Sequence, residues 1–369
     1  MPDIVVFGAT GYTGDLVARA LVARGRRPVL AARNAERLGA LAAELGGLET
    51  RVADVERPDS VQALVQGGDV LVSTVGPFAR WGEPAVQGAI AAGAHYLDST
   101  GEPAFIRDVF QRHGPSAATA GVGLLTAFGY DWVPGNLAGG LALDDAGPAA
   151  TAVEIGYFTT GASMGAGAMS GGTRASAAGV LLAPGHAFRG GRLVIERGAR
   201  RLGIFETAPG RRVAGISTGG SEHFALPRVQ RALRDVDVFL GWFGPLSRPL
   251  QALSLGQSLV TRIPGVRPAI DATVRTLVSG SSGGPDATAR SRSGSLVLAR
   301  ALDTAGRELS SVRLEGPNGY DVTADLLAWG AETALTGGLQ GTGALGPVDG
   351  FGLAALRAGA EQAGLRRVG

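Results

Sequence analysis

A glycine-rich turn near the N-terminus contains the first residues of this chain that could do chemistry. It lies in the stretch IVVFGATGYTG, between an apolar run and a segment whose apolar residues have helical spacing. Glycines let a backbone turn tightly and approach a pyrophosphate, which N–H groups at the helix N-terminus then stabilise. The motif predicts a dinucleotide-binding turn, and the alternative is a tight turn without a ligand. The residues of the turn that we expect to contact the cofactor are Gly8, Thr10, Gly11, Tyr12, Thr13 and Gly14.

The end of the second predicted strand indicates which dinucleotide to expect. Enzymes that use NAD usually place an Asp or Glu there, which accepts hydrogen bonds from the ribose hydroxyl groups. This strand instead ends on Arg33 and Asn34, with a fixed cation and no carboxylate. Because a guanidinium pairs well with a 2′-phosphate, these residues favour NADP(H). The alternative is that Arg33 is a solvated charge at a strand end.

The ends of the other predicted strands should complete the cofactor site, because ligands of doubly wound sheets lie beyond the carboxyl ends of the strands. Asp54 and Val55 follow the third strand, where contacts to the adenine ring are expected. The stretch 73–77 should pass close to the ribose and the nicotinamide. The cofactor contacts expected after the fourth, fifth and sixth strands are Ser73, Thr74, Val75, Gly76, Pro77, Thr100, Gly101 and Gly129.

Hydride transfer needs a dry pocket over the nicotinamide and, for a reduction, a proton donor beside it. Tyr130 and Asp131 follow the sixth predicted strand. Tyr130 could donate a proton or orient the substrate, and Asp131 could hold the carboxamide of the cofactor. Asp131 could equally cap the helix that Pro134 begins. His223 could reach a pocket, although a lone histidine is more often structural.

A second candidate for the pocket wall is the uncharged, glycine-rich stretch 155–173. Glycine-rich backbone can approach a ligand closely, and the alternative is a loop with no ligand. The Gly, Ser and Thr content of the stretch argues against a membrane span. The candidates for the pocket wall in this stretch are Tyr157, Ser163, Ser170 and Thr173, of which Tyr157 is a catalytic candidate. No spacing in the chain resembles a metal site, so we expect no metal.

The elements that must position these residues alternate over the first 130 residues. The expected strands are 3–8, 28–33, 50–55, 69–76, 95–99 and 122–129. The expected helices are 14–25, 35–47, 58–68, 83–94 and 102–114. Strands separated by helices of this length predict an α/β fold with an N-terminal Rossmann domain, a doubly wound parallel sheet, over residues 1–145.

Residues 146–369 have a different pattern, which predicts an α/β substrate and dimerisation domain with a mostly antiparallel sheet. Its expected strands are 151–159, 191–197, 211–218, 293–303 and 307–316. The segment 280–294 is predicted to be a flexible loop. Helical patterns at 322–335 and 350–364 predict that a C-terminal segment, about 322–369, packs back on the first domain.

Composition excludes several classes of function. The 369 residues contain no cysteine, which removes thiolate metal sites and cysteine nucleophiles, and no lysine, which removes Schiff-base chemistry. The formal net charge of +2 is not the basic excess of a nucleic-acid binder. The N-terminus leads directly into a strand, and we expect a cytoplasmic protein without a targeting segment.

Several motifs in the same order resemble the saccharopine dehydrogenase-like oxidoreductases, in particular their trans-acting enoyl reductase branch. They are GATGYTG (8–14), VSTVGPFARWGEPAV (72–86), AGAHYLDSTGEPAFIRDV (92–109), AFGYDWVPGNL (127–137), SGGT (170–173) and PNGYDVTADLLAWGAETAL (317–335). The resemblance spans most of the chain. It implies a Rossmann domain, a substrate domain with an open, mostly antiparallel sheet, and NADP(H) as cofactor. The family commonly has Cys and Ser where this chain has Ala127 and Trp132, which implies a bulky, apolar pocket.

We therefore predict an NADPH-dependent reductase of a conjugated C=C (enoyl) bond in an apolar intermediate of lipid or polyketide type. Reduction of a ketone or an imine on the same scaffold is the alternative, and a non-catalytic NADP(H)-binding regulator or scaffold is an alternative of another class. The substrate could be free or carrier-bound. The Arg-rich stretch 189–201 could meet a phosphopantetheine arm or an acidic carrier, although a solvated strand face explains it better. The apolar stretch 236–265 could form a homodimer interface or a lid, and peripheral membrane contact is less favoured.

Overall fold

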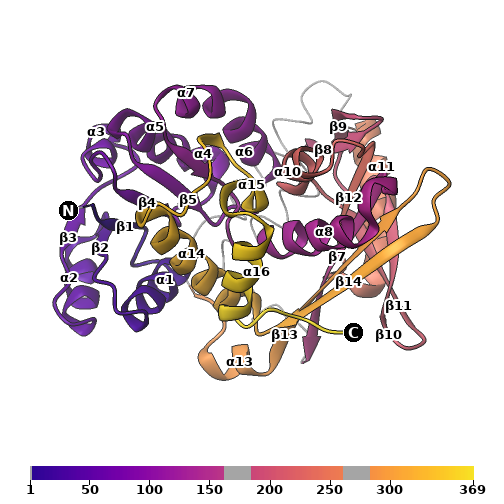
Figure 1. The fold of residues 1–369 in the computed structure, drawn as a ribbon. Coiled ribbons are helices and arrows are strands. Elements are labelled where there is room, and N and C mark those ends of the chain that lie inside the picture. The colour runs from indigo at the N-terminus through magenta and orange to yellow at the C-terminus, as the bar shows by residue number, and fades with distance from the viewer. Residues whose placement is uncertain (1, 162–183, 261–282) are drawn as a thin grey trace. The chain divides into compact units, whose positions relative to one another are not determined.

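The computed structural model describes residues 2–161, 184–260 and 283–369, and the chain divides into two compact units (Figure 1). Unit 1 comprises Met1–Gly101, Phe105–Val133 and Asn318–Leu365. Unit 2 comprises Glu102–Ala104, Pro134–Pro317 and Arg366–Gly369. The main change of unit therefore comes at Val133, whereas the sequence places the domain boundary at 145. In the described parts of the chain, no helix is long and apolar enough to cross a membrane.

Unit 1 is built on a seven-stranded parallel sheet in the order β15-β6-β5-β4-β1-β2-β3. The strands are β1 (Ile4–Phe7), β2 (Val29–Ala32), β3 (Thr50–Val52), β4 (Val70–Ser73), β5 (His95–Asp98), β6 (Gly123–Leu125) and β15 (Gly343–Ala344). Strands β1, β2 and β4 are buried along their whole length, as expected for a sheet covered on both faces. The predicted doubly wound parallel sheet is confirmed.

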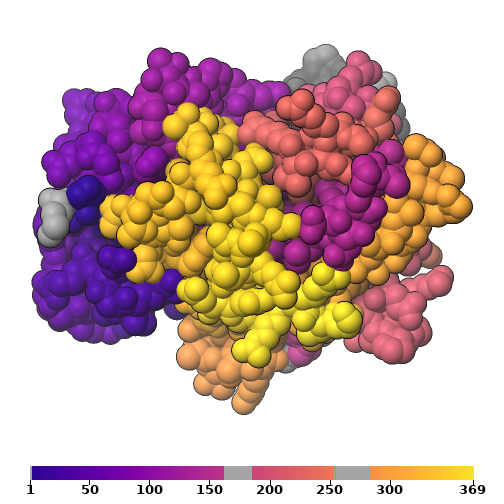
Figure 2. All heavy atoms as spheres, in the orientation of Figure 1, coloured from indigo at the N-terminus to yellow at the C-terminus, as the bar shows by residue number. Residues whose placement is uncertain are grey.

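Helices connect these strands and cover the sheet. They are α1 (Tyr12–Ala23), α2 (Ala35–Glu44), α3 (Pro58–Gln62), α4 (Phe78–Trp81), α5 (Glu83–Ala92), α6 (Pro103–Asp108) with a π-helical turn (Val109–His113), α7 (Gly114–Thr119), α14 (Gly319–Leu335), α15 (Pro347–Phe351) and α16 (Leu353–Gln362). Helix α14 lies beside α1, where Arg24 Nε is 2.8 Å from Glu332 Oε2. The C-terminal segment therefore lies against the N-terminal segment of unit 1, yellow against indigo in Figure 2.

Unit 2 contains a nine-stranded sheet with the path β10-β11-β12-β7-β13-β14-β16, and β8 pairs with both β12 and β9. The strands are β7 (Ala152–Gly161), β8 (Pro184–Arg189), β9 (Arg192–Arg197), β10 (Leu202–Ala208), β11 (Arg211–Ser217), β12 (Asp235–Leu240), β13 (Ser293–Leu302), β14 (Glu308–Gly316) and β16 (Arg366–Arg367). Only the β12–β7 pairing among these strands is parallel, so the sheet is mixed and mostly antiparallel, as predicted. Phe158, Phe205, Phe239 and Leu296 form an apolar cluster on it.

Helix α8, one of the helices of unit 2, explains why unit 2 begins before the predicted domain boundary at 145. The helices of unit 2 are α8 (Val133–Ala146), α10 (Glu222–Val229), α11 (Ser247–Val260) and α13 (Ala287–Ser291), with 3₁₀ turns at Gly147–Ala149 and Gly244–Leu246. Helix α8 packs closely in unit 2, where a Cβ on Gly139 would lie 2.7 Å from Leu226 and 3.1 Å from Ile155. Because 133–143 is buried throughout, α8 has no polar face over that length and lacks the periodicity that marks a helix in sequence.

Two further sequence predictions need correction. Residues 287–291 of the predicted loop form α13, which begins because Asp286 Oδ1 accepts a hydrogen bond from the Ala289 amide at 2.8 Å. Part of the apolar stretch 236–265 is an interior strand, since β12 lies between β11 and β7 and its residues 236–240 are buried. Those residues are apolar because they belong to the core of the sheet. An interface or lid formed by the rest of the stretch stays a prediction, and its residues 261–265 lie outside the described residues.

Candidate active site

The glycine turn forms a narrow cradle between β1 and α1. Gly8 has a φ of +89°, which L side chains rarely adopt, and its carbonyl accepts a hydrogen bond from the Gly11 amide at 2.8 Å. A Cβ on Gly14 would lie 2.2 Å from the Gly8 carbonyl oxygen, so no larger residue fits there. No side chain caps the first turn of α1, which begins at Tyr12. Its amide groups can therefore hold a pyrophosphate, and the residues present fit a dinucleotide.

The end of β4 lies directly against this cradle. Thr74 Oγ1 donates a hydrogen bond to the Phe7 carbonyl oxygen at 3.1 Å. A Cβ on Gly8 would meet Thr74 Oγ1 at 2.7 Å and Val75 Cγ2 at 2.9 Å. Next to them, the buried Ser73 Oγ has no hydrogen-bond partner among the described residues. The structure thus brings the predicted 73–77 stretch to the glycine turn, with Gly76 and Pro77 leading into α4.

On the β2 side of the cradle, the structure adds a second arginine to the predicted pair. Arg33 is exposed. Asn34 Oδ1 accepts a hydrogen bond from the Arg37 amide at 2.8 Å and so caps α2. The Arg37 guanidinium donates to the Thr10 carbonyl oxygen at 3.2 Å, which places it at the glycine turn. We did not predict Arg37, although its place one helical turn after Arg33 was a usable signal.

Asp54 and Val55 begin the turn from β3 into α3 and are partly buried. Asp54 Oδ1 accepts a hydrogen bond from the Glu56 amide at 3.1 Å, and the Asp54 amide donates to Ser60 Oγ at 2.9 Å. These contacts shape the turn. Their role toward an adenine ring stays a prediction.

A buried carboxylate that we did not predict, Asp98 at the end of β5, organises the next two strand ends. Its Oδ1 accepts hydrogen bonds from the amides of Thr100 at 2.9 Å and Ala127 at 2.8 Å. Its Oδ2 accepts one from Thr126 Oγ1 at 2.8 Å. Burial raises the pKa of Asp98 to about 6, and these hydrogen bonds oppose the rise. The carboxylate therefore fixes the turns that carry Thr100, Gly101 and the segment after β6.

Helix α14 supports Tyr130 from one side. The Tyr130 amide donates to Thr323 Oγ1 at 2.9 Å, and a Cβ on Gly129 would lie 2.8 Å from Thr323 Cγ2. Tyr130 is 6% exposed, and its ring packs so closely on Gly319 that a Cβ there would lie 2.9 Å away. This leaves Tyr130 in a fixed position. The predicted packing of the segment 322–369 on the first domain did not specify that Thr323, 193 residues away, contacts Tyr130.

Asp131 has a different environment from its neighbours. The residue is partly exposed, but its Oδ1 is buried and accepts no hydrogen bond from any described residue. A Cβ on Gly101 would lie 3.0 Å from its Oδ2. Burial raises the pKa of Asp131 from 3.8 to about 7. The interpretation of Asp131 as a helix cap finds no supporting hydrogen bond, and the group is a carboxyl poised to titrate near neutral pH.

Tyr157 lies in unit 2, in a buried cluster between α8 and α10. Its hydroxyl donates to Glu222 Oε1 at 2.7 Å and accepts a hydrogen bond from the Gly135 amide at 2.7 Å. Beside it, Asn136 Nδ2 donates to Ser221 Oγ at 2.9 Å. These contacts tie β7 to the first turns of both helices. Catalysis by Tyr157 stays a prediction, and the accompanying candidates Ser163, Ser170 and Thr173 lie outside the described residues.

His223 is also buried in unit 2. Its Nδ1 lies 3.0 Å from the Gly220 carbonyl oxygen, and its ring centroid is 5.2 Å from that of His186. Burial lowers the pKa of His223 to about 4, so the ring is neutral at neutral pH. This environment accounts for His223 as a packed, hydrogen-bonded residue, and a catalytic role for it stays a prediction.

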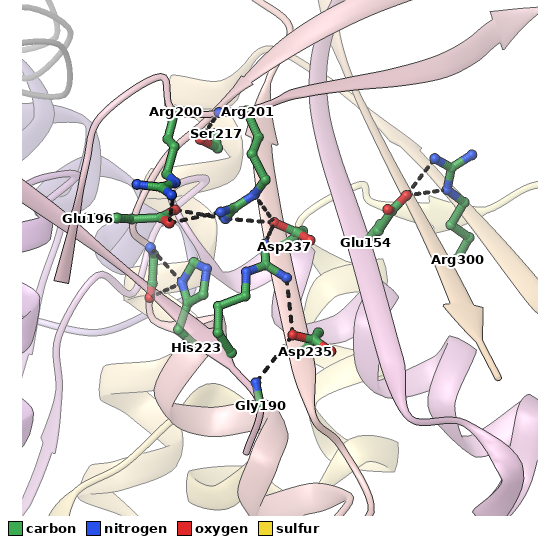
Figure 3. A network of polar contacts seen from close by, with 12 residues as sticks. Glu154, Gly190, Glu196, Arg200, Arg201, Ser217, His223, Asp235, Asp237 and Arg300 are labelled. Atoms are coloured by element: carbon green, nitrogen blue, oxygen red, sulfur yellow. Dashed lines mark hydrogen bonds and ion pairs between the residues drawn. The ribbon is translucent and has the colours of Figure 1, made fainter. Parts of the chain in front are cut away.

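The Arg-rich stretch 189–201 is paired with carboxylates of its own unit (Figure 3). Arg201 contacts Glu196, with Nη2 to Oε1 at 2.7 Å, and Asp237, with Nη2 to Oδ1 at 2.9 Å. Arg189 also pairs with Asp237 and is 3.5 Å from Asp235 Oδ1. Two of the arginines are thus neutralised inside the sheet, which agrees with the strand-face interpretation of this stretch.

The chain is similar to several known proteins. Residues 4–124 match the family model described as the saccharopine dehydrogenase NADP binding domain. A protein of Mycobacterium tuberculosis (strain ATCC 25618 / H37Rv), provisionally named a trans-acting enoyl reductase, is 31% identical over 365 residues, which are 88% of this chain and 86% of that protein. The chain belongs to the saccharopine dehydrogenase-like family. Its predicted resemblance to that family's trans-acting enoyl reductase branch is confirmed.

Other proteins are similar to this chain in sequence or in fold. A trans-acting enoyl reductase of Mycobacterium leprae (strain TN) is 38% identical over 141 residues, which cover 37% of this chain and 34% of that protein. The apo saccharopine dehydrogenase (L-Glu forming) of Saccharomyces cerevisiae has the same fold, with a TM-score of 0.61 at 11% identity over all of both chains. So does the NAD complex of homospermidine synthase from Legionella pneumophila, with a TM-score of 0.62 at 9% identity over 100% of this chain and 91% of that one. This saccharopine dehydrogenase-like chain is an oxidoreductase whose unit 1 takes a nicotinamide dinucleotide.

Proposed function

We propose that this protein is an NADPH-dependent reductase of a conjugated C=C bond in an apolar substrate. The observation that carries the proposal is the glycine cradle at the end of β1 together with the carboxyl of Asp131, which lies beside Gly101 and follows β6, three strands along the sheet. A dinucleotide site and a titratable acid on one sheet edge are what a reduction needs. The relatives named trans-acting enoyl reductases support a C=C bond as the target.

A preference for NADPH over NADH is supported by the charges at the end of β2. Arg33 is exposed and the Arg37 guanidinium is held at the glycine turn by Thr10. A 2′-phosphate between two guanidinium groups would gain charge-assisted hydrogen bonds that NADH cannot make. The absence of a carboxylate at this strand end removes the usual partner of the NAD ribose.

The substrate class rests on the relatives and on the local sequence. The names of the relatives support an enoyl substrate, and the lipid or polyketide type is part of the proposal. Trp132 directly follows Asp131 and is 1% exposed, which fits an apolar surrounding for the reacting bond. Because the arginines 189 and 201 pair with internal carboxylates, they supply little charge for a carrier protein, and this favours a free substrate over a carrier-bound one.

A panel of substrates tests the proposal. NADPH oxidation would be measured with an enoyl, a keto and an imine compound that carry the same alkyl chain. We expect turnover of the enoyl compound alone. Turnover of only the ketone or the imine would replace the proposal by the alternative reductase, and NADPH binding without turnover of any compound would favour a regulator.

Matched glycine variants show whether such turnover depends on the cradle. Gly14→Ala places a Cβ 2.2 Å from the Gly8 carbonyl oxygen and should abolish NADPH binding and turnover. Gly39→Ala, on α2 with nothing within 4 Å of the new Cβ, should leave both unchanged. Equal effects of the two variants would contradict the assignment of the cradle.

A further inference from the structure

We propose that Asp131 is the proton donor of the reduction and that the carboxyl acts in its protonated form. This inference rests on the proposed function for its substrate, but the placement of Asp131 is independent of that substrate. Three observations carry it: its position along the sheet, the state of its carboxyl group, and the contacts that fix it.

The position follows from the order of the strands. The cradle lies at the end of β1, and the arginines that suit the adenosine phosphate lie on the β2 side. A dinucleotide that crosses the end of β1 therefore extends its nicotinamide half along β4, β5 and β6. Thr74 follows β4, Gly101 follows β5, and Asp131 follows β6. Asp131 Oδ2 lies against Gly101, where an added Cβ would be 3.0 Å away.

The carboxyl is in a state suited to giving up a proton near neutral pH. Its Oδ1 is buried and has no hydrogen-bond partner among the described residues, and its pKa is raised to about 7. Burial is the only cause of that rise, and among the described residues no charged group contributes to it. The titratable groups on the adjoining segments, Tyr130 and Asp98, do not stabilise the ionised form. A carboxylic acid of this pKa is an effective general acid at neutral pH.

The backbone around Asp131 is fixed on both sides. Upstream, the Asp98 carboxylate holds the Ala127 amide, and Ala127 has a φ of +58°, in the left-handed region. Next to Asp131, the Tyr130 amide is held by Thr323. A left-handed conformation in a residue other than glycine persists only where its surroundings enforce it, and it often marks a functional site. Asp131 is thus positioned before a substrate arrives, as a general acid must be.

A hydride, which carries both electrons, would bond to the β-carbon of the enoyl group as its C–H bond to the bound cofactor breaks. The C=C π pair then forms the carbon–carbon double bond of an enolate, and the carbonyl π pair moves to the carbonyl oxygen. The O–H bond of Asp131 then breaks as the α-carbon takes the proton, which forms the second C–H bond. The carboxylate that remains is reprotonated from water, so each turnover consumes one NADPH and one proton.

The test compares Asp131→Asn with Asp59→Asn, whose parent carboxyl is exposed on α3. We expect Asp131→Asn to keep NADPH affinity, measured by fluorescence, and to lower kcat by about 10²- to 10⁴-fold, the usual contribution of a general acid. It should also remove the fall in rate above neutral pH that we expect of the wild type. Asp59→Asn should match the wild type in all three. A wild-type rate and pH profile for Asp131→Asn, with the loss appearing instead in Tyr130→Phe, would overturn the proposal.

A second readout does not depend on turnover. In substrate-free protein labelled with carboxyl-¹³C aspartate, infrared difference spectra should contain the carbonyl band of a protonated carboxyl that disappears as the pH rises through neutrality. The band that titrates near pH 7 should be missing from Asp131→Asn and present in Asp59→Asn, whereas a band that titrates near pH 6, from Asp98, should be present in both variants. Persistence of the band near pH 7 in Asp131→Asn would overturn the proposal even if the enoyl substrate were wrong, whereas turnover of only a ketone would overturn the proposed function and leave this result to decide the role of Asp131.

Gly101→Ala tests whether the position of the Asp131 carboxyl matters, because the variant keeps the carboxyl group but moves it. The added Cβ would lie 3.0 Å from Asp131 Oδ2 and must displace the carboxyl slightly. We expect this variant to lose rate while it keeps a titrating carbonyl band. A wild-type rate in Gly101→Ala would contradict the placement of the carboxyl beside the reacting carbon.

Discussion

The Asp98 carboxylate accepts a hydrogen bond from the Ala127 amide at 2.8 Å, which ties the end of β5 to the turn that follows β6. The same oxygen, Asp98 Oδ1, accepts a hydrogen bond from the Thr100 amide at 2.9 Å. Ala127 has a φ of +58°, and left-handed backbone costs an L residue about 1–2 kcal/mol. Asp98 therefore stabilises a strained turn, and through it the positions of Gly101 and Asp131.

Replacing Asp98 should destabilise unit 1. Asp98→Ala leaves the two amides and the Thr126 hydroxyl buried without their acceptor, and we expect a loss of about 2–4 kcal/mol in the free energy of unfolding. Asp98→Asn keeps one acceptor oxygen and should lose less. Urea denaturation measures both. An unchanged midpoint for Asp98→Ala would contradict the role assigned to this carboxylate.

The same residue predicts a pH dependence of stability. The pKa of Asp98 is raised from 3.8 to about 6 in the folded chain, so the folded state binds its proton more tightly than the unfolded state. Its contribution to stability is therefore present at low pH and is lost as the pH rises from about 4 to about 6. Asp98→Asn should flatten the stability curve in that interval, and a curve parallel to that of the wild type would be evidence against the raised pKa.

Arg33 should control the choice of nucleotide. Arg33→Asp replaces the cation at the end of β2 by the group that NAD enzymes use there. We expect its NADPH affinity to fall by about 10- to 100-fold, as for the loss of one charge-assisted contact, with little change for NADH. Isothermal titration with both nucleotides measures the ratio. Arg211→Asp, at an exposed position on β11, controls for net charge, and equal losses for NADPH and NADH in Arg33→Asp would refute the assignment.

Tyr157→Phe distinguishes a structural role of the hydroxyl from a catalytic one. The variant leaves the Gly135 amide and Glu222 without the Tyr157 hydroxyl in a buried cluster, and we expect a loss of about 1–3 kcal/mol in unfolding free energy. Where the variant is fully folded, kcat should stay close to that of the wild type. A large fall in kcat with unchanged stability would instead make Tyr157 a catalytic residue.

The paired arginines of unit 2 predict unequal effects for two neighbouring aspartates. Asp237, 9% exposed, holds Arg189 and Arg201 together, and Asp237→Asn should lower unfolding free energy by about 2–4 kcal/mol because it leaves two half-buried guanidinium groups facing one another. Asp235 lies on the same strand but is more exposed, so Asp235→Asn should lower the free energy of unfolding by less than about 1 kcal/mol. Thermal unfolding of the two variants would contradict this account if Asp235→Asn were the less stable.

Much of the fold could be predicted because its signals are local. The strands of unit 1 are short apolar runs that end at glycine or polar residues, and the runs at 3–8 and 69–76 contain β1 and β4. The strands that we missed lack such a signal. Strand β12 begins Asp235-Val236-Asp237, with carboxylates in a sheet, and these are tolerated because Arg189 of β8 and Arg201, which directly precedes β10, pair with them.

The candidate site likewise combines features that have a local sequence signal with features that depend on contacts between distant residues. The glycine turn is recognisable within a few residues, so the cradle and a nicotinamide dinucleotide could be predicted, and the role of Arg33 in the choice of nucleotide stays a prediction. Asp98 acquires its role from partners 28 and 29 residues away, and Thr323 holds a residue 193 positions earlier in the chain. Such contacts depend on the order of strands in the sheet, which periodicity does not specify. The raised pKa of Asp131 likewise depends on burial that only the folded chain provides.

The position of the transferred hydrogen in the product is the most direct test of whether this protein reduces a C=C bond. The wild-type protein would reduce an enoyl substrate with NADPH deuterated at the transferable position, and the product would be analysed by NMR and mass spectrometry. For reduction of the C=C bond we expect one deuterium at the carbon β to the carbonyl, with the α-carbon hydrogen derived from solvent. Deuterium at a carbinol or amine carbon, or no transfer at all, would contradict it.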